Sequence, residues 1–228
     1  MFRPSLSLDV VRRPWTRIVR APGHRPLAEV FANPDDREAA RQVMAIGTDA
    51  LISDSRPLPQ EPEAAVRMAP FRALGQPSRF SDGSFGVLYA ALDTETAIAE
   101  TVFHAERHLD ATDEDPIEFD MVSYVGEVQK PLEDLRGDAY GHLRQRPVET
   151  WPICQAFGRE RHAAGAWGLV YPSARRPGGE CIGAFRPAAV SIPARNAQFR
   201  YCWDGASVRR VLTISEIREF PPPVYRVA

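Results

Sequence analysis

The sequence predicts an α+β fold. Predicted elements follow one another as a strand, a helix, several strands, a second helix and then mostly strands, so they do not alternate as in a doubly wound parallel sheet. The 228 residues are 44% hydrophobic and 25% charged, which is an ordinary globular composition. A chain of this length forms one domain, or one domain with an appendage, and buries roughly 70% of its unfolded surface.

We divide the chain into an N-terminal extension, residues 1–69, and a main domain, residues 70–228. The first part of the extension contains repeated prolines and basic side chains. One strand fits there, around either Val10–Val11 or Ile18–Val19.

The extension also contains a predicted helix and a predicted loop. Asn33 can cap a helix that begins at Pro34, and apolar residues at helical spacing continue it to about Ser53. Proline lacks an N–H donor and fixes φ, so residues 54–70 are predicted as loop or linker. The prolines concerned are Pro57, Pro59, Pro62 and Pro70.

The main domain begins with a strand and a capped helix. Val87–Ala91 is a short apolar run typical of a buried strand, and Asp93 or Thr94 can cap a helix that ends near His108. A second helix is predicted near Trp151–Ala164. Further strands are predicted at Ile117–Val128, Gly168–Tyr171, Cys181–Phe185, Val190–Ile192, Phe199–Trp203 and Val208–Ile214.

Charge and cysteine content narrow the class of protein. The balance of 28 basic against 30 acidic residues gives no general electrostatic footprint for nucleic acid, so no direct nucleic-acid partner is expected. Cys154, Cys181 and Cys202 show no C-x-x-C spacing and fit reduced, buried thiols. There is no signal-peptide core and no run of ~18 apolar residues, so we expect a soluble cytoplasmic protein without a membrane segment. The oligomeric state is left open, a homo-oligomer included.

Common catalytic and nucleotide-binding motifs are missing. The sequence has no G-x-G-x-x-G after a strand and no P-loop, and Ser173 lies outside a G-x-S-x-G motif. His104 and His108 belong to H-A-E-R-H, in which Glu106 stands one position late for the H-E-x-x-H zinc motif. No metal cofactor is therefore expected.

Residues 78–104 combine side chains that suit a nucleotide glycoside. Arg79 precedes a turn rich in serine and glycine, Tyr89 lies on a predicted strand, and Glu100 lies on the capped helix. Arginine binds phosphate through a planar fork, tyrosine can stack or hydrogen-bond, and a carboxylate can stabilise positive charge or orient a ribose hydroxyl. Helical periodicity places Glu100 about 200° from Ile98 and its apolar stripe. The ordinary alternatives are a solvated glutamate, a surface arginine and a core tyrosine.

A second cluster lies at residues 168–187. A short apolar strand leads into Ser173, Arg175 and Arg176, then a Pro-Gly-Gly turn and another strand. Ser173 and the loop donors can line a phosphate-bearing cleft, because glycine lets backbone amides approach an anion closely. The alternative is two strands joined by a basic loop.

These blocks resemble the RES domain family, which is named for recurring arginine, glutamate and serine residues. The resemblance rests on Arg79 in SRFSDG, Tyr89 in VLYAA, Glu100 at the end of TETAIAE and Ser173 in VYPSAR. It covers roughly residues 70–205. Many members have a glycine pair before the arginine and an Asn-Pro pair after the later strand, and this chain departs from both patterns with Pro77-Ser78 and Arg186-Pro187.

The resemblance implies a fold, an activity and a partner. Family members are similar to ADP-ribosyltransferases, with a mixed sheet flanked by helices, and act as toxins of bacterial toxin–antitoxin pairs. Characterised members consume NAD by hydrolysis or phosphorolysis, or transfer ADP-ribose to a protein. A separate antitoxin of the helix-turn-helix Xre class covers their active site.

The resemblance also implies roles for individual residues in an NAD site. Glu100 would stabilise the oxocarbenium-like ribose or position its hydroxyls, and Arg79 would hold the pyrophosphate. Tyr89 would stack against or orient the nicotinamide riboside, and Ser173 would hydrogen-bond ribose or phosphate. Arg175 is an additional candidate for binding NAD. The acceptor is left open between water, phosphate and a protein side chain.

Two interpretations of other classes stay open. In the first, the chain is a catalytically inactive module that binds a nucleotide or an antitoxin. In the second, the constellation is incidental and the protein is an interaction scaffold. A protein that binds NAD but forms no product is typical of the first. A protein that binds neither a nucleotide nor an antitoxin is typical of the second.

Overall fold

The computed structural model describes residues 6–21, 59, 61–72, 74–111, 115–144 and 151–216. Within them, nine strands form one hydrogen-bonded sheet in the order β1-β5-β6-β7-β3-β2-β4-β8-β9. Only β5 and β6 pair in parallel among these strands; the other neighbours are antiparallel. A mixed sheet with a few helices confirms the predicted α+β class.

The elements have the following bounds. The strands are β1 (Leu8–Asp9), β2 (Trp15–Arg20), β3 (Leu88–Ala91), β4 (Ile117–Gly126), β5 (Leu132–Asp134), β6 (Gly168–Pro172), β7 (Glu180–Ala184), β8 (Ala194–Trp203) and β9 (Val208–Ile214). The helices are α3 (Pro62–Arg72), α4 (Thr94–Ala111) and α5 (Trp151–Ala163), with short 3-10 helices η1 (Asp138–Leu143) and η3 (Pro187–Ala189). None of the helices in the described ranges is long and apolar enough to cross a membrane.

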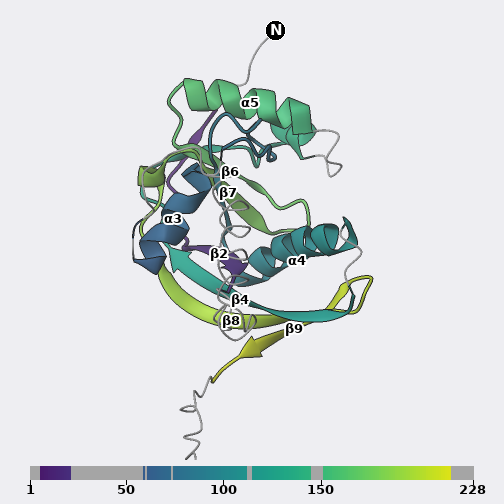
Figure 1. Cartoon of the computed structure of the whole chain (residues 1–228). Coiled ribbons are helices and arrows are strands. Elements are labelled where there is room, and N and C mark those ends of the chain that lie inside the picture. Colours follow the sequence, from purple (N-terminus) through teal and green to yellow (C-terminus); the bar gives the residue numbers. More distant parts are fainter. Residues whose placement is uncertain are drawn as a thin grey trace, which may run out of the picture.

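Helix α4 lies on the concave side of the sheet. It contacts β2, β3 and β9, and Figure 1 shows β4 and β8 curving around it, with α5 near the opposite end of the molecule. Asp93 caps its N-terminus, since the Asp93 carboxylate accepts hydrogen bonds from the Thr96 N–H (2.7 Å) and hydroxyl (2.8 Å). The predicted capped helix is confirmed, and it continues to Ala111.

The central strands are buried on both faces. Along β3, Leu88 and Ala90 belong to one hydrophobic cluster, whereas Tyr89 and Ala91 pack on the other. Side chains alternate between the two faces of a strand, so a strand covered on both sides reads as a continuous apolar run. The sequence VLYAA has this property, which explains why β3 could be predicted.

Two predicted segments differ in the structure. The loop predicted at residues 54–70 is wrong from Pro62 onward, where α3 begins. A proline at the first helical position lacks only a donor that the helix would leave unused, and Pro70 lies in the last turn. The strand predicted at Val190–Ile192 is also wrong: Val190 forms a single bridge with Val128, and its N–H bonds to Pro187 of η3.

Strand β2 connects the first part of the chain to the main sheet. It contains Ile18 and Val19, which confirms one of the two alternatives for a strand in this segment. It lies between β3 and β4 and pairs with β4 along its whole length. The division at residue 70 stays a prediction, and the helix predicted at residues 34–53 lies outside the described residues.

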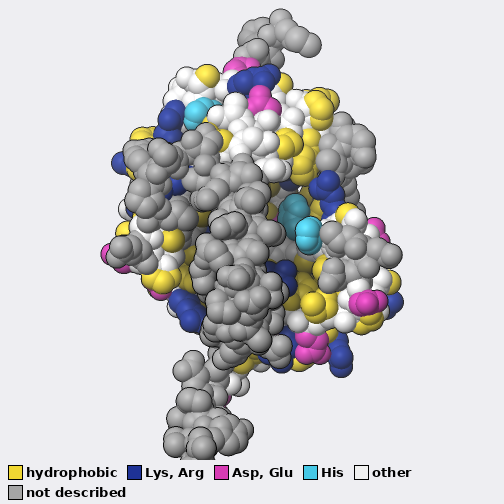
Figure 2. All heavy atoms as spheres, in the orientation of Figure 1, with side chains coloured by type: hydrophobic (Ala, Val, Ile, Leu, Met, Phe, Trp, Pro, Cys, Tyr) yellow, Lys and Arg dark blue, Asp and Glu magenta, His cyan; other side chains and the backbone are white. Residues whose placement is uncertain are grey.

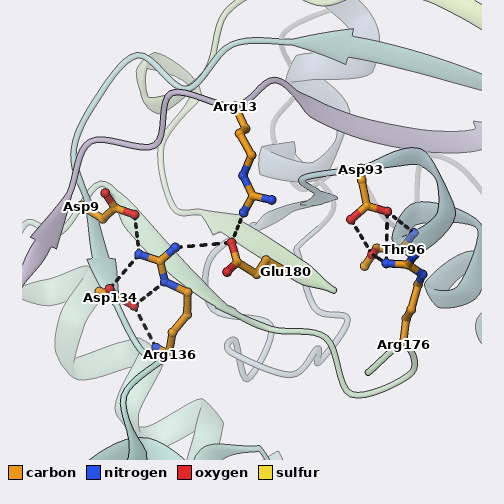
Figure 3. A network of polar contacts seen from close by, with 8 residues as sticks. All are labelled: Asp9, Arg13, Asp93, Thr96, Asp134, Arg136, Arg176 and Glu180. Carbon is orange, nitrogen blue, oxygen red and sulfur yellow. Dashed lines mark hydrogen bonds and ion pairs between the residues drawn. The ribbon is translucent and has the colours of Figure 1, made fainter. Parts of the chain in front are cut away.

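An ion-pair network holds the N-terminal segment against the sheet (Figure 3). Arg136 binds Asp9 (2.5 Å), Asp134 (2.8 Å) and Glu180 (3.3 Å), and Arg13 also binds Glu180. The hydrogen bonds that Arg136 donates to the Asp134 carboxylate raise the pKa of Arg136, so the guanidinium is charged at every pH of interest. The network joins β1, β5 and β7, and it includes Arg13, which lies just before β2.

A buried ion pair anchors α5 to strand β5. The Arg161 Nε donates to both carboxylate oxygens of Glu133 on β5, at 3.0 and 2.8 Å, and Glu133 is 5% exposed. Arg161→Ala leaves this carboxylate buried without its partner, so we expect the free energy of unfolding to fall by about 3 kcal/mol. Chemical denaturation measures the change.

The matched control is Arg209→Ala, because the Arg209–Asp204 pair is exposed. It should change the free energy of unfolding by less than about 1 kcal/mol. Equal effects of the two substitutions would contradict the assigned role of Arg161.

Candidate active site

A cavity of about 890 Å³ lies between α4, α5 and the central strands. Its size is typical of pockets that bind a cofactor-sized molecule. The described lining contains four arginines and one carboxylate. These are Arg17 of β2, Arg79 of the loop before β3, Arg107 of α4, Arg175 of the loop after β6, and Glu100 of α4. Such a lining favours an anionic ligand.

The Glu100 carboxylate is held by Ser173. The Ser173 hydroxyl donates to Glu100 Oε1 at 2.6 Å, and its oxygen accepts from the N–H groups of Arg175 (3.1 Å) and Arg176 (3.0 Å). The two main-chain donors occupy the lone pairs of the hydroxyl, so its proton points to the carboxylate. The thiol of Cys181 lies 3.8 Å from the same Oε1. One oxygen of Glu100 is thereby fixed.

Glu100 is half-buried, unlike the solvated alternative that helical periodicity favoured. Ile98 and Val102 pack against the core as the apolar stripe predicts. The helical periodicity of apolar residues indicates only this apolar face of α4. It does not indicate polar contacts on the other faces of the helix. The loop between β6 and β7 covers another side of α4 through the Ser173–Glu100 contact, and that contact joins residues 73 positions apart.

Arg79 lies against a pair of aromatic rings that contact each other. Its guanidinium carbon is 5.2 Å from the Phe80 ring centroid and 5.0 Å from that of Tyr171, and its Nη2 donates to the Leu143 carbonyl at 2.7 Å. Helix α5 approaches so closely that a Cβ at Gly158 would collide with the main chain of Phe80. The surrounding elements thus fix the guanidinium at the cavity wall.

Tyr89 positions the loop that carries Arg79. Its hydroxyl accepts the Phe80 N–H at 2.9 Å and lies 2.9 Å from the Ser78 hydroxyl, with which it shares a hydrogen bond. Burial raises the pKa of Tyr89 to about 12, so the hydroxyl stays protonated near neutral pH. The hydroxyl of Tyr89 therefore holds the loop in place by hydrogen bonds, and the side chain also forms part of the cavity wall.

Arg17 is a site residue that the sequence analysis missed. Its Nη1 donates to the Tyr89 carbonyl at 2.7 Å, and its Nε is buried without a hydrogen-bond partner in the described part of the chain. Burial lowers the pKa of Arg17 to about 10, which still leaves it charged at neutral pH. A basic residue inside the strand WTRIVR was the available signal, because burying an arginine in a strand is costly unless something binds it.

The outer part of the cavity carries His104, Arg107, Trp151 and Arg175. Figure 2 shows histidine and basic side chains on the exposed face between α5 and α4. The Arg175 guanidinium lies 3.3 Å from the Phe103 ring centroid, and that of Arg107 lies 5.8 Å from the Trp151 ring. Burial lowers the pKa of His104, and the negative charge of Glu100 opposes this shift.

The structure therefore brings the predicted residues together. Arg79, Tyr89, Glu100 and Arg175 line one cavity, and Ser173 stands directly behind Glu100 as its hydrogen-bond partner. Among the described residues, no group of three or more His, Cys, Asp or Glu side chains is placed to hold a metal ion. All three cysteines are buried and free, as predicted.

Comparisons with known proteins identify relatives. A family model described as RES domain matches residues 58–204. The uncharacterized protein y4oC of Sinorhizobium fredii is 28% identical over 144 residues, which are 62% of this chain and 58% of that protein. The chain therefore spans less than two thirds of this relative's length. A chain in the crystal structure of the M. tuberculosis MbcT–MbcA toxin–antitoxin complex aligns with a TM-score of 0.45 and 14% identity, over 87% of this chain and 88% of that one.

The electrostatics of the cavity predict how His104 titrates. Burial disfavours the imidazolium, so we expect a pKa below 6.5 and a neutral ring at pH 7. Since Glu100 raises this pKa, Glu100→Gln should lower it further. Unfolding removes the partial desolvation of the ring and restores its ordinary pKa, so His104 costs stability as the pH falls below about 6.5.

NMR titration of the imidazole signals measures the pKa in both proteins, and His104→Gln identifies the signal by its loss. A His104 pKa that rises when Glu100 is replaced would show that the two side chains do not face one another.

Proposed function

The chain belongs to the RES domain family, and we propose that it is an enzyme that cleaves the nicotinamide glycosidic bond of NAD. The observation that carries the proposal is the Glu100 carboxylate, held by Ser173 at 2.6 Å in a cavity that four arginines line. A fixed carboxylate suits a reaction in which positive charge develops on a sugar. The arginines suit the pyrophosphate of a dinucleotide.

Arg17 and Arg79 are the proposed pyrophosphate ligands. Both donate to main-chain carbonyls, those of Tyr89 and Leu143, and the Arg79 guanidinium also faces two aromatic rings. A carbonyl dipole orients a guanidinium without cancelling its charge. The positive charge therefore stays available to an anion, and Arg175 adds to it at the outer end.

In the proposed reaction, the bond between ribose C1′ and the pyridinium nitrogen breaks. Its electron pair leaves with nicotinamide, which becomes neutral, and the ribose acquires oxocarbenium character. The carboxylate of Glu100 stabilises that charge in the transition state more than in the ground state, which is what accelerates the step. The acceptor then bonds to C1′ and loses its proton, and it is water, inorganic phosphate or a protein side chain.

Ser173 and Tyr89 act through their neighbours in this proposal. The Ser173 hydroxyl uses its proton in the hydrogen bond to Glu100, and so fixes one oxygen of that carboxylate. Its role in this proposal is to position Glu100 rather than to bind the ribose. Tyr89 holds the Ser78–Phe80 loop through its hydroxyl and forms a wall for the nicotinamide riboside. Its raised pKa makes it a poor proton donor or base near neutral pH.

We also propose a biological role as the toxin of a toxin–antitoxin pair. Family membership supports this role, and the partner would be an antitoxin of the Xre class that covers the cavity. The outer residues His104 and Arg107 are exposed and accessible to such a partner.

Turnover of NAD by purified variants tests the catalytic site. Glu100→Gln keeps the acceptor for Ser173 and removes the charge, and Arg17→Ala removes one pyrophosphate ligand. Each should lower kcat/KM by at least ~10-fold, equivalent to ~1.4 kcal/mol. Arg209→Ala, at an exposed ion pair far from the lining, is the control and should retain wild-type turnover.

Products are identified after incubation with and without phosphate. Free nicotinamide with ADP-ribose, or with its phosphorylated form, supports the proposal. NAD that binds and stays intact over hours identifies an inactive binding module instead, and unchanged kinetics in Glu100→Gln would remove the role of the carboxylate.

Growth of cells that express the chain tests the toxin role. Expression of the wild type should arrest growth, and Glu100→Gln, expressed to the same level, should not. An Xre-class antitoxin encoded beside the gene should restore growth. Equal arrest by both proteins would separate the toxicity from NAD cleavage.

A further inference from the structure

The outer end of the cavity is built from an arginine and a tryptophan on different helices. Arg107 lies on α4 and Trp151 is the first residue of α5, and both line the cavity. The Arg107 guanidinium lies 5.8 Å from the centroid of the Trp151 ring. Arg107 is exposed and Trp151 half-buried, so part of each side chain faces the solvent or the cavity.

The inner end has a different character. Ala91, Ala97 and Cys181 line it, and each is at most 4% exposed. These side chains come from β3, α4 and β7, so the sheet and the helix close the cavity there. A long ligand cannot extend past this end, and the end where Arg107 and Trp151 lie is an open direction for it.

The direction of the dinucleotide follows if the proposed function holds. Glu100, one helical turn before His104 and two before Arg107, marks the nicotinamide ribose. Arg17 and Arg79 take the pyrophosphate, and the remaining adenosine half must then point away from the closed end. It meets the pair formed by Arg107 and Trp151.

The chemistry of the pair fits a purine. An indole ring and a planar guanidinium both present flat surfaces, on which a base can stack. Trp151 carries no charge, and within the described lining the sole carboxylate is Glu100. We propose that Trp151 and Arg107 form the adenine-binding end of the cavity and thereby select a dinucleotide over a mononucleotide. This inference rests on the proposed function for the placement of the nicotinamide ribose.

Calorimetry with two halves of the substrate tests this assignment without turnover. AMP carries the adenine, and nicotinamide mononucleotide carries the reacting bond. Because stacking of one base on an aromatic side chain is a substantial part of such binding, Trp151→Ala should weaken AMP binding at least ~10-fold. Trp151→Phe keeps an aromatic face and should lose less than ~3-fold. Neither variant should change binding of the mononucleotide.

Trp167→Ala is the matched control. Trp167 also lies beside a cation, with the Lys130 ammonium 5.4 Å from its ring, but it packs against the second hydrophobic cluster outside the cavity lining. It should leave AMP binding unchanged. In NAD turnover, Trp151→Ala should raise the KM for NAD, because the variant loses binding of the adenine half.

The outcomes distinguish this inference from the proposed function. AMP binding that is equal in wild type and Trp151→Ala overturns the adenine assignment, even if the enzyme consumes NAD. Equal loss of AMP and mononucleotide binding also overturns it, because Trp151 would then act on the whole cavity. Selective loss of AMP binding supports it, and a wild type that leaves NAD intact then contradicts only the catalytic proposal.

Discussion

The hydrogen bond from Ser173 to Glu100 joins the loop after β6 to helix α4, and the geometry of the cavity depends on it. The same loop and helix meet a second time, where Arg176 donates to the Thr96 hydroxyl at 3.3 Å and lies 3.7 Å from the capping carboxylate of Asp93 (Figure 3). Two polar contacts, one helical turn apart, therefore fix the rotation of α4 relative to the loop. The Glu100 carboxylate therefore has a defined position, because the loop that carries Ser173 and the helix that carries Glu100 are both held in place.

Two pairs of arginines in the described part of the chain differ in their partners. Arg136 and Arg161 pair with carboxylates and hold β1 and α5 to the sheet. Arg17 and Arg79 instead donate to carbonyl oxygens at the cavity wall. An ion pair neutralises a guanidinium, whereas a carbonyl leaves its charge in place. Arg136 and Arg161 thus stabilise the scaffold, whereas Arg17 and Arg79 keep their positive charge at the cavity wall.

The sequence predicted the segments in which local pattern and tertiary environment agree. The apolar run of β3 and the cap of α4 are examples, since both depend on neighbouring residues alone. The exposure of Glu100 could not be predicted, because the loop that covers it is 73 residues away. Arg17 was missed because strand pairing across the sheet brings it to Tyr89, 72 residues further on. Local spacing contains neither fact, and the resemblance to a family covered only part of the chain.

In the proposed function, one cavity orients NAD through its arginines and its closed inner end. The most direct measurement is a crystal structure of Glu100→Gln with NAD bound, since this substitution removes the charge and keeps the shape. We expect density for the nicotinamide ribose beside residue 100 and for the pyrophosphate between Arg17 and Arg79. A dinucleotide bound in the reverse direction, or outside this cavity, would contradict it.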